Sequence, residues 1–295
     1  MKRALITGIN GFTGRYVAQE LEQAGWEVWG IGSQAQSDCS QRYRQVNLLD
    51  HSRLNDVVSD ISPDVVVHLA AIAFVAHGDA DAFYRVNIVG TRNLLSALAN
   101  CDKTPDCVLI ASSAYIYGNA TAGVLNEKSA PNPANDYAVS KLAMEYMSNL
   151  WRDKLPIVIA RPFNYTGVGQ SESFLLPKIV NHFRRGESFI ELGNLDVSRD
   201  FTDVRAVAKA YRRLLQTKPI NEIVNICSGK AISLRHVLDL VQRISGRTIE
   251  VRLNPNFVRA NDVKTLSGDP SKLLSIIGDW DSPCLTDTLK WMMEA

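Results

Sequence analysis

The chain has 295 residues, which corresponds to one large domain or two closely joined ones at roughly 100–200 residues per domain. Hydrophobic residues make up 46% and charged residues 21%, as is typical of a globular protein with a full hydrophobic core. The 32 Lys and Arg residues nearly balance the 31 Asp and Glu residues, so the net charge is +1. Because nucleic-acid and membrane-surface binding usually need a basic excess or patch, we expect no nucleic acid and no membrane as partner.

The sequence contains five cysteines, an odd number without any CxxC pair. That pattern indicates neither a disulfide framework nor a zinc site, so we expect reduced thiols and no bound metal. No apolar run approaches the roughly 18 residues that a membrane-spanning helix needs. These features together predict a cytoplasmic protein.

In the first half of the chain, short apolar runs alternate with longer amphipathic stretches. This alternation predicts an α/β fold with a doubly wound parallel (Rossmann) sheet. The predicted strands are Arg3–Thr7, Glu27–Ile31, Arg44–Leu48, Asp64–Leu69, Cys107–Ala111 and Pro156–Ala160. The predicted helices are Arg15–Ala24, Leu54–Ile61, Asp81–Asn100 and Tyr137–Arg152.

After Arg161 the pattern loosens, and we expect a smaller mixed α/β lobe. Helical spacing recurs at Leu175–Arg185 and Leu234–Ser245, and residues 200–215 combine a loop with a helix. The remaining stretches are rich in turn residues or polar and irregular, namely Asn164–Gln170 and Asn254–Pro270. We therefore divide the chain into a sheet domain over residues 1–163 and a smaller lobe over residues 164–295, with part of 200–228 packing back on the sheet domain.

A glycine-rich turn, Thr-Gly-Ile-Asn-Gly-Phe-Thr-Gly, ends at Gly14 between the first predicted strand and the first predicted helix. In this position Gly8 permits a tight turn, Gly11 lets the backbone approach a pyrophosphate, and Gly14 allows close packing of helix and strand. The helix N-terminus adds free N–H groups and a partial positive charge. Such turns also occur without a ligand, but placement at the first βα turn predicts a dinucleotide site.

A tyrosine and a lysine, Tyr137 and Lys141, stand four residues apart and so share one helix face. A free phenol has a pKa of about 10, and a lysine charge one turn away is expected to lower it toward the working range. Ser113 follows a buried strand at the end where ligands bind in α/β sheets, so we expect it to contact a substrate oxygen. These three residues are the predicted catalytic set.

The chain resembles the extended short-chain dehydrogenase/reductase family over nearly its whole length. The resemblance is carried by motifs that occur in the family's order: the glycine spacing GxxGxxG, the segment His68-Leu69-Ala70-Ala71, Asn87, Ser113 and the YxxxK pair. The resemblance implies a nicotinamide dinucleotide cofactor. The implied cofactor-binding residues are Gly8, Asn10, Gly11, Phe12, Thr13, Gly14, Ser33, Asn47, Leu48, Leu69, Ala70, Ala71, Asn87, Tyr137, Lys141 and Arg161.

The end of the second predicted strand, Gly-Ile-Gly-Ser-Gln, carries no acid that would bind the adenosine ribose of NAD. Ser33 and Gln34 could instead donate to a 2′-phosphate, with Arg15 close by. NADP, as NADPH, is therefore the preferred cofactor, and NADH stays possible.

The family's nucleotide-sugar branch contains 4-epimerases, 4,6-dehydratases and 4-keto reductases. Dehydratases place acids just after the catalytic Ser or Thr, where this chain has Ala114 and Tyr115, so dehydration is disfavoured. The segments Arg161–Gln170 and 192–204 are similar to those of enzymes acting on GDP-mannose-derived sugars, except that Tyr165 replaces the usual His and Val168 the usual Pro. The implied substrate-binding residues are Ser113, Ala114, Asn164, Lys178, Arg199 and Arg259, the arginines pairing with phosphate.

The expected function is NADPH-dependent reduction of the C4 ketone of a nucleotide-linked 4-keto-6-deoxyhexose, with GDP as the favoured nucleotide. A UDP- or dTDP-sugar 4-epimerase with bound NAD is the enzymatic alternative, and a cofactor-sensing protein of the same fold is the non-enzymatic one. The resemblance also implies a homodimer formed by a four-helix bundle, with Asp81–Asn100 and Tyr137–Arg152 as the candidate helices.

Overall fold

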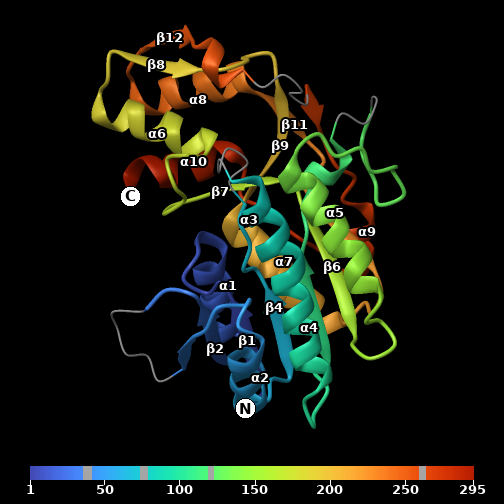
Figure 1. The fold of residues 1–295 in the computed structure, drawn as a ribbon. Helices are drawn as coiled ribbons and strands as arrows, with labels where there is room; N and C mark the ends of the chain where they lie inside the picture. Colours follow the sequence, from blue (N-terminus) through green and yellow to red (C-terminus); the bar gives the residue numbers. More distant parts are fainter. Residues whose placement is uncertain (36–41, 74–78, 119–122, 259–263) are drawn as a thin grey trace.

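The computed structural model describes residues 1–35, 42–73, 79–118, 123–258 and 264–295. Its largest layer is a seven-stranded sheet in the order β10-β6-β5-β4-β1-β2-β3, and every pairing in it is parallel (Figure 1). The predicted doubly wound α/β sheet is thereby confirmed. The strands are β1 (Arg3–Thr7), β2 (Glu27–Gly32), β3 (Tyr43–Gln45), β4 (Val65–His68), β5 (Cys107–Ala111), β6 (Ile157–Pro162) and β10 (Ile223–Ile226).

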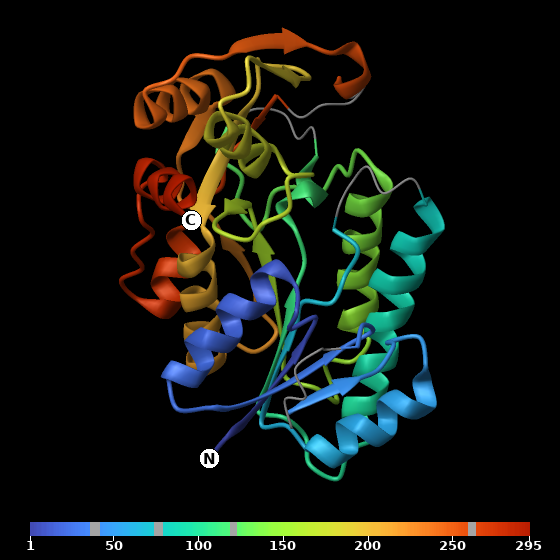
Figure 2. The same ribbon diagram turned by 90° about the vertical axis from the view of Figure 1, so that its left-hand side faces the viewer.

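Helices cover both faces of this sheet, as the edge-on view in Figure 2 shows. Because successive strand residues point to opposite faces, Ala4 and Ile6 of β1 pack with one helical layer and Leu5 packs with the other. The first layer contains α1 (Phe12–Gln23), α7 (Val204–Thr217) and α9 (Ser271–Ile277). The second contains α2 (His51–Ile61), α4 (Thr91–Ala99) and α5 (Asp136–Asn149).

The predicted single helix Asp81–Asn100 is instead three consecutive pieces, α3 (Ala80–Tyr84), a π-helical turn (Arg85–Gly90) and α4. The π-helical turn contains Asn87, which is buried and needs partners for its amide. Its Oδ1 accepts from the Ile72 N–H at 2.9 Å, and its Nδ2 donates to Ser140 Oγ at 3.0 Å. The wider turn therefore coincides with a buried polar side chain, a feature that apolar spacing does not reveal.

Much of the chain beyond β6 forms a small lobe of helices and short strands, the upper part of Figure 1. Helices α6 (Leu175–Arg185) and α8 (Leu234–Ser245) have the predicted bounds, and α10 (Leu285–Glu294) shares their apolar core. The central strand β9 (Ser198–Asp203) pairs with β7 (Asn164–Thr166), β11 (Ala231–Ser233) and β13 (Thr265–Leu266). A separate pair joins β8 (Phe189–Leu192) to β12 (Glu250–Leu253). Strands β7 and β13 lie in stretches predicted to be turn-rich or irregular, and β9 overlaps the loop predicted from residue 200. None of the six strands that the structure describes in this lobe was predicted.

The chain leaves the large sheet after β6 and returns to it with β10, which pairs with β6 from Ile223 opposite Ile159 to Ile226 opposite Pro162. Between them, α7 packs against α1. Residues of α7 and β10 thus pack with the large sheet. The division into 1–163 and 164–295 stays a prediction.

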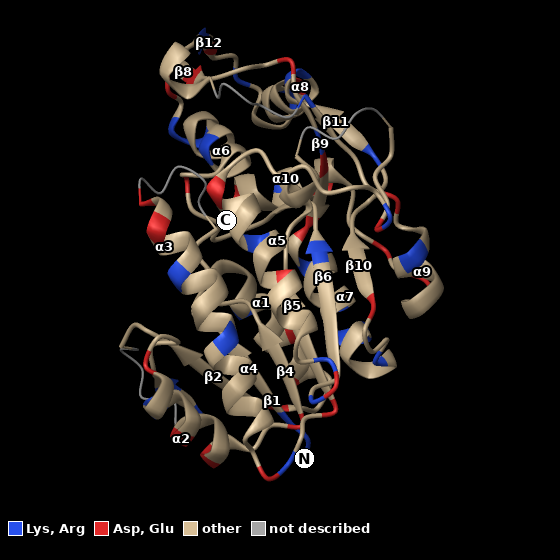
Figure 3. Cartoon of the chain, turned by 45° about the vertical axis from the view of Figure 1, so that its right-hand side comes forward, with Lys and Arg blue, Asp and Glu red and all other residues tan. Residues whose placement is uncertain are grey.

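Basic and acidic residues are interspersed along the helices and loops in Figure 3, in keeping with a net charge of +1. Within the described ranges, none of the helices combines the length and the apolar character that crossing a membrane requires.

Candidate active site

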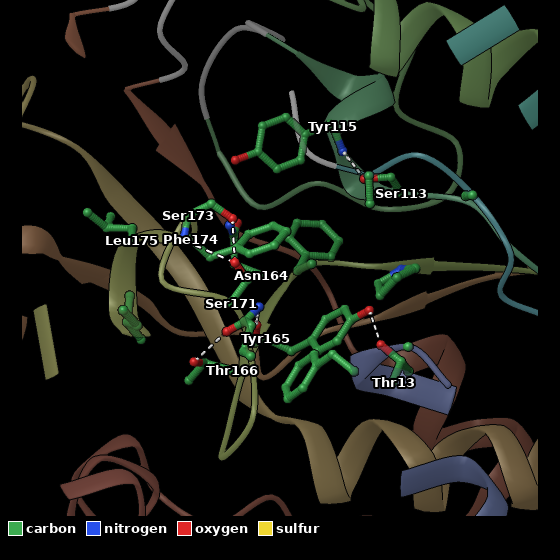
Figure 4. Close-up of a pocket in the computed structure, with 18 of the residues that line it drawn as sticks. Thr13, Ser113, Tyr115, Asn164, Tyr165, Thr166, Ser171, Ser173, Phe174 and Leu175 are labelled. Carbon is green, nitrogen blue, oxygen red and sulfur yellow. Dashed lines mark hydrogen bonds between the residues drawn. The ribbon is translucent and has the colours of Figure 1, made fainter. Parts of the chain in front are cut away.

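A cavity of about 720 Å³ lies between the carboxyl ends of β1, β5 and β6 and the small lobe. Its position is the one at which ligands bind in open α/β sheets, and its size suits a small-molecule site. Figure 4 shows part of it. The predicted site residues that line it are Gly8, Asn10, Gly11, Phe12, Thr13, Gly14, Leu69, Ala71, Ser113, Tyr137, Lys141, Asn164 and Arg199.

The glycine loop forms one wall of the cavity with the geometry that its spacing predicts. Gly8 has a φ of +72°, a left-handed conformation that favours glycine, and a Cβ on Gly14 would lie 2.4 Å from the Gly8 carbonyl oxygen. The helix α1 begins at Phe12 rather than at the predicted Arg15, and its N-cap Gly11 contributes no side-chain hydrogen bond. The first N–H groups of α1 are therefore left for an anionic ligand.

His68 orders the turn that follows β4 through a chain of hydrogen bonds. Thr91 Oγ1 donates its proton to the Asn87 carbonyl at 2.7 Å, so His68 Nε2 must donate to Thr91 Oγ1 at 2.8 Å. His68 Nδ1 then accepts from Thr7 Oγ1 at 2.7 Å, and Thr7 Oγ1 accepts the two backbone N–H groups that follow His68. Burial, with help from the Lys141 charge, lowers the pKa of His68 to about 3, so the ring is neutral and its tautomer is set.

The three predicted catalytic side chains meet in the cavity. Burial raises the pKa of Tyr137 well above its usual range, and the nearby Ser113 hydroxyl lowers it only partly. Burial lowers the pKa of Lys141 to about 8, while the Glu145 charge raises it. Lys141 Nζ donates to the Ala111 carbonyl at 2.7 Å. The predicted lowering of the Tyr137 pKa by Lys141 is therefore wrong for this geometry, because burial dominates and the ammonium is held by the end of β5.

Ser113 is oriented by the residues that follow it. Its Oγ accepts the Tyr115 N–H at 3.2 Å, which leaves the hydroxyl proton free to be donated (Figure 4). The Tyr115 ring also lines the cavity and meets the Tyr137 ring edge-on, with centroids 6.2 Å apart. Ala114, predicted to touch substrate, is fully buried behind this turn and does not line the cavity.

Arg161, predicted to bind the cofactor, makes an internal ion pair instead. Its Nε donates to Glu145 Oε1 at 2.9 Å and its Nη2 to Glu145 Oε2 at 2.7 Å. Its Nη1 donates to Tyr117 Oη at 2.8 Å. Arg161 is not among the residues that line the cavity, so the structure argues against the predicted cofactor contact.

Several other predicted residues also stand outside the cavity lining. Lys178 donates to the Glu191 carbonyl at 2.7 Å and lies over the ring of Phe257, which does line the cavity. Arg259 belongs to a segment outside the described residues. The others that do not line the cavity are Ser33, Asn47, Leu48, Ala70 and Asn87.

The structure adds polar lining residues that sequence reasoning missed, chiefly Gln170, Ser171, Ser173 and Asn194. The hydroxyl-rich stretch after Gln170 was the available signal. Two buried atoms of lining residues, Asn164 Oδ1 and Ser112 Oγ, have no hydrogen-bond partner in the described part of the chain, and a polar ligand would satisfy them. Within the same part, no group of three or more His, Cys, Asp and Glu side chains is placed to hold a metal ion.

Two characterised proteins resemble this chain over most of its length. The GDP-6-deoxy-D-talose 4-dehydrogenase of Aggregatibacter actinomycetemcomitans is 37% identical over 278 residues, covering 94% of this chain and 92% of that protein. The GDP-6-deoxy-D-mannose reductase of Pseudomonas aeruginosa is 32% identical over 288 residues, covering 94% and 91%.

Two solved structures share the whole fold. A protein from Burkholderia cenocepacia J2315, provisionally called an epimerase, is 53% identical with a TM-score of 0.93, covering 99% of this chain and 97% of that one. RMD from Pseudomonas aeruginosa, solved in complex with NADPH, is 29% identical with a TM-score of 0.86, covering 100% and 98%. The model of the NAD dependent epimerase/dehydratase family matches residues 4–227. The chain therefore belongs to the NAD-dependent epimerase/dehydratase family.

Proposed function

We propose that the protein reduces the C4 ketone of a GDP-linked 4-keto-6-deoxyhexose with NADPH. The main support for this proposal is that Ser113, Tyr137 and Lys141 line the same cavity as the glycine loop. The names of the two characterised relatives supply the substrate class, since both act on GDP-linked 6-deoxyhexoses. Talose and mannose differ only in configuration at C4, so one 4-keto sugar accounts for both names.

The chain's own residues suit proton delivery to a ketone. Because the pKa of Tyr137 is raised, its phenol is protonated and donates to the C4 oxygen as a general acid. The Ser113 hydroxyl polarises the same oxygen, and Lys141 places a positive charge in the same cavity while donating to the Ala111 carbonyl. The hydride to C4 would come from a dihydronicotinamide held by the glycine loop, so the ketone would be reduced to the alcohol and the cofactor oxidised.

For the cofactor, we propose that the glycine loop and the α1 N-terminus hold the diphosphate. Gly14 has no room for a side chain, and the first N–H groups of α1 lack a cap, as a close phosphate contact requires. NADP is favoured over NAD because no acid ends β2, where Ser33 and Gln34 stand. RMD was solved with NADPH, which supports the same choice.

For the sugar nucleotide, we propose that Asn164 and Arg199 contact the diphosphate within the cavity. The buried, unpartnered Oδ1 of Asn164 and the position of Arg199 on β9 support this role. Arg259 is kept as a proposed second phosphate contact from the sequence pattern alone. In this scheme residues 1–163 supply most of the cofactor site and residues 164–295 most of the substrate site.

For the assembly, we propose a homodimer in which two helical stretches of each copy form a four-helix bundle. One stretch is the continuous run of α3, the π-helical turn and α4, and the other is α5. Apolar side chains on these elements and at the C-cap of α5 are exposed, with 43% of Val89, 65% of Tyr146 and 82% of the C-cap Leu150 accessible. Large apolar side chains that gather on neighbouring helices are typical of a protein interface.

The test is a spectrophotometric assay of NADPH oxidation with the GDP-linked 4-keto-6-deoxyhexose. We expect turnover by the natural chain, and a Tyr137→Phe variant that binds NADPH without turnover. Tyr84→Phe is a matched control that should leave the rate unchanged, because within the described residues the Tyr84 hydroxyl donates to Asp136 at an exposed position.

Other outcomes would point to the rival functions. Tightly bound NAD in the purified protein, with interconversion of a UDP- or dTDP-sugar, would establish the 4-epimerase. Cofactor binding with no turnover of any of these sugars would favour a cofactor-sensing protein.

A further inference from the structure

Tyr165 lies where the glycine loop meets the opposite wall of the cavity. Its Oη is 2.8 Å from Thr13 Oγ1, the bond drawn in Figure 4, and its ring stacks on Phe12 with centroids 6.1 Å apart. Phe12 and Thr13 begin α1, at the proposed diphosphate site. Asn164, next to Tyr165 in the chain, lies at the proposed sugar-nucleotide site. Tyr165 therefore contacts the proposed diphosphate site and is next in sequence to a residue of the proposed sugar-nucleotide site.

Further hydrogen bonds join the same two segments. Tyr16 Oη donates to the Val168 carbonyl at 2.7 Å, and Arg15 Nη2 donates to the Gly169 carbonyl at 3.2 Å. Residues 12, 13, 15 and 16 of α1 thus all contact residues 165–169. The start of α1 and this segment form one joined unit that lines the cavity.

The segment continues into the strands that carry the proposed substrate contacts. Gln170 closes the turn, since its Nε2 donates to the Tyr165 carbonyl at 3.2 Å. On the other side, β7 pairs with β9, and Asn164 lies opposite Phe201 in that register. Arg199 lies two residues earlier on β9 and lines the cavity. Tyr165 is thus connected to Asn164 through the chain itself and to Arg199 through the β7–β9 strand pair.

We propose that Tyr165 is a positioning residue that couples the two halves of the cavity, so that cofactor and sugar nucleotide each strengthen binding of the other. The proposal rests on the proposed function. Whichever ligand binds first orders the joined unit of α1 and residues 165–170, and the second ligand then loses less conformational freedom. Coupling of this kind is reciprocal by thermodynamic necessity.

The experiment measures the GDP dissociation constant by titration calorimetry with and without saturating NADP⁺. We expect NADP⁺ to tighten GDP binding to the natural chain. Tyr165→Phe should reduce that coupling about three- to tenfold, the equivalent of one hydrogen bond of ordinary net strength, while GDP binding alone changes little. Thr13→Val should reduce it equally, and the double variant should lose no more, because both changes remove the same bond.

Hydrogen exchange provides a readout independent of affinity. NADP⁺ should slow backbone exchange in residues 164–170 of the natural chain and have a smaller effect in Tyr165→Phe. Tyr84→Phe, remote from the joined unit, should keep the natural coupling. Thr13→Val leaves the stack of Tyr165 on Phe12 in place, so it carries the test if Tyr165→Phe does not fold.

Three results would overturn the proposal: no coupling in the natural chain, equal coupling in Tyr165→Phe, or additive losses in the double variant. Failure of GDP or NADP⁺ to bind the natural chain at all is a different result. It would contradict the proposed function, and with it the inference built on that function.

Discussion

Glu145 and Arg161 form an ion pair whose side chains are 4% and 5% exposed, and loss of the carboxylate should destabilise the fold strongly. The substitution Glu145→Gln keeps the size of the side chain but removes its charge. It also sets an amide N–H₂ against a guanidinium that made two hydrogen bonds, at 2.9 and 2.7 Å. The Arg161 charge would then remain buried without a counter-charge.

Breaking a buried pair from one side costs about 3–5 kcal/mol, a large share of the roughly 5–15 kcal/mol that stabilises a folded protein. At about 2–4 °C per kcal/mol for domains of 150–250 residues, the melting temperature should fall by about 6–20 °C. Asp196→Asn is the matched control, because its pair with Arg235 is 78% and 63% exposed and should contribute less than about 1 kcal/mol.

Thermal and urea unfolding followed by circular dichroism measure both variants. Replacing the whole pair, with Glu145→Met and Arg161→Met together, should recover much of the loss, because no unpaired charge stays buried. Recovery should be incomplete, since Arg161 also donates to Tyr117. The reasoning is refuted if Glu145→Gln costs no more than Asp196→Asn, or if the double variant loses as much as the two single changes added together.

Four further outcomes are expected. The pKa of His68 is about 3 in the fold, below its ordinary value of 6.5. Between these two pH values the unfolded chain binds more protons than the folded one, so the free energy of unfolding falls as the pH drops. In His68→Asn, the free energies of unfolding from urea titrations at pH 7 and pH 5 should differ less than in the natural chain. With a Lys141 pKa of about 8, kcat/KM should fall above pH 8, and a flat pH–rate profile would contradict this. The free energy of unfolding should instead rise from about pH 8 toward pH 10.5, because in that range the lysine keeps its proton only in the unfolded chain. Gly14→Ala should cost about 1–3 kcal/mol in urea unfolding, since its Cβ would lie 2.4 Å from a carbonyl oxygen, and an unchanged midpoint would disprove the tight contact. Leu150→Glu, at the C-cap of α5, should turn the proposed dimer into a monomer in light scattering, and an unchanged mass would exclude the C-terminal end of α5 from the interface.

Features set by local sequence were predictable. The bounds of β1 and β5 match the prediction because continuous apolar runs there end in glycine or serine. Tyr137 and Lys141 share a helix face through their spacing alone, and their convergence with Ser113 follows from strand ends meeting at one edge of a parallel sheet.

Features that depend on distant partners were not predictable. The four residues of β10 become a strand only by pairing with β6. Arg161 looked available for a ligand because its partner Glu145 lies on another element, 16 residues away. Tyr165 stood out only as a departure from the family's usual His, because its partner Thr13 is 152 residues distant in the chain.

The late return of β10 to the large sheet has a consequence for biosynthesis. All six residues of β6 are buried, and until residue 226 has been made the hydrogen-bonding edge of that strand has no partner on the β10 side. An uncovered, apolar edge strand readily pairs with other chains. A nascent chain, or a fragment ending near residue 163, should therefore need chaperone protection, and such a fragment expressed alone should collect in the insoluble fraction while the full chain stays in solution.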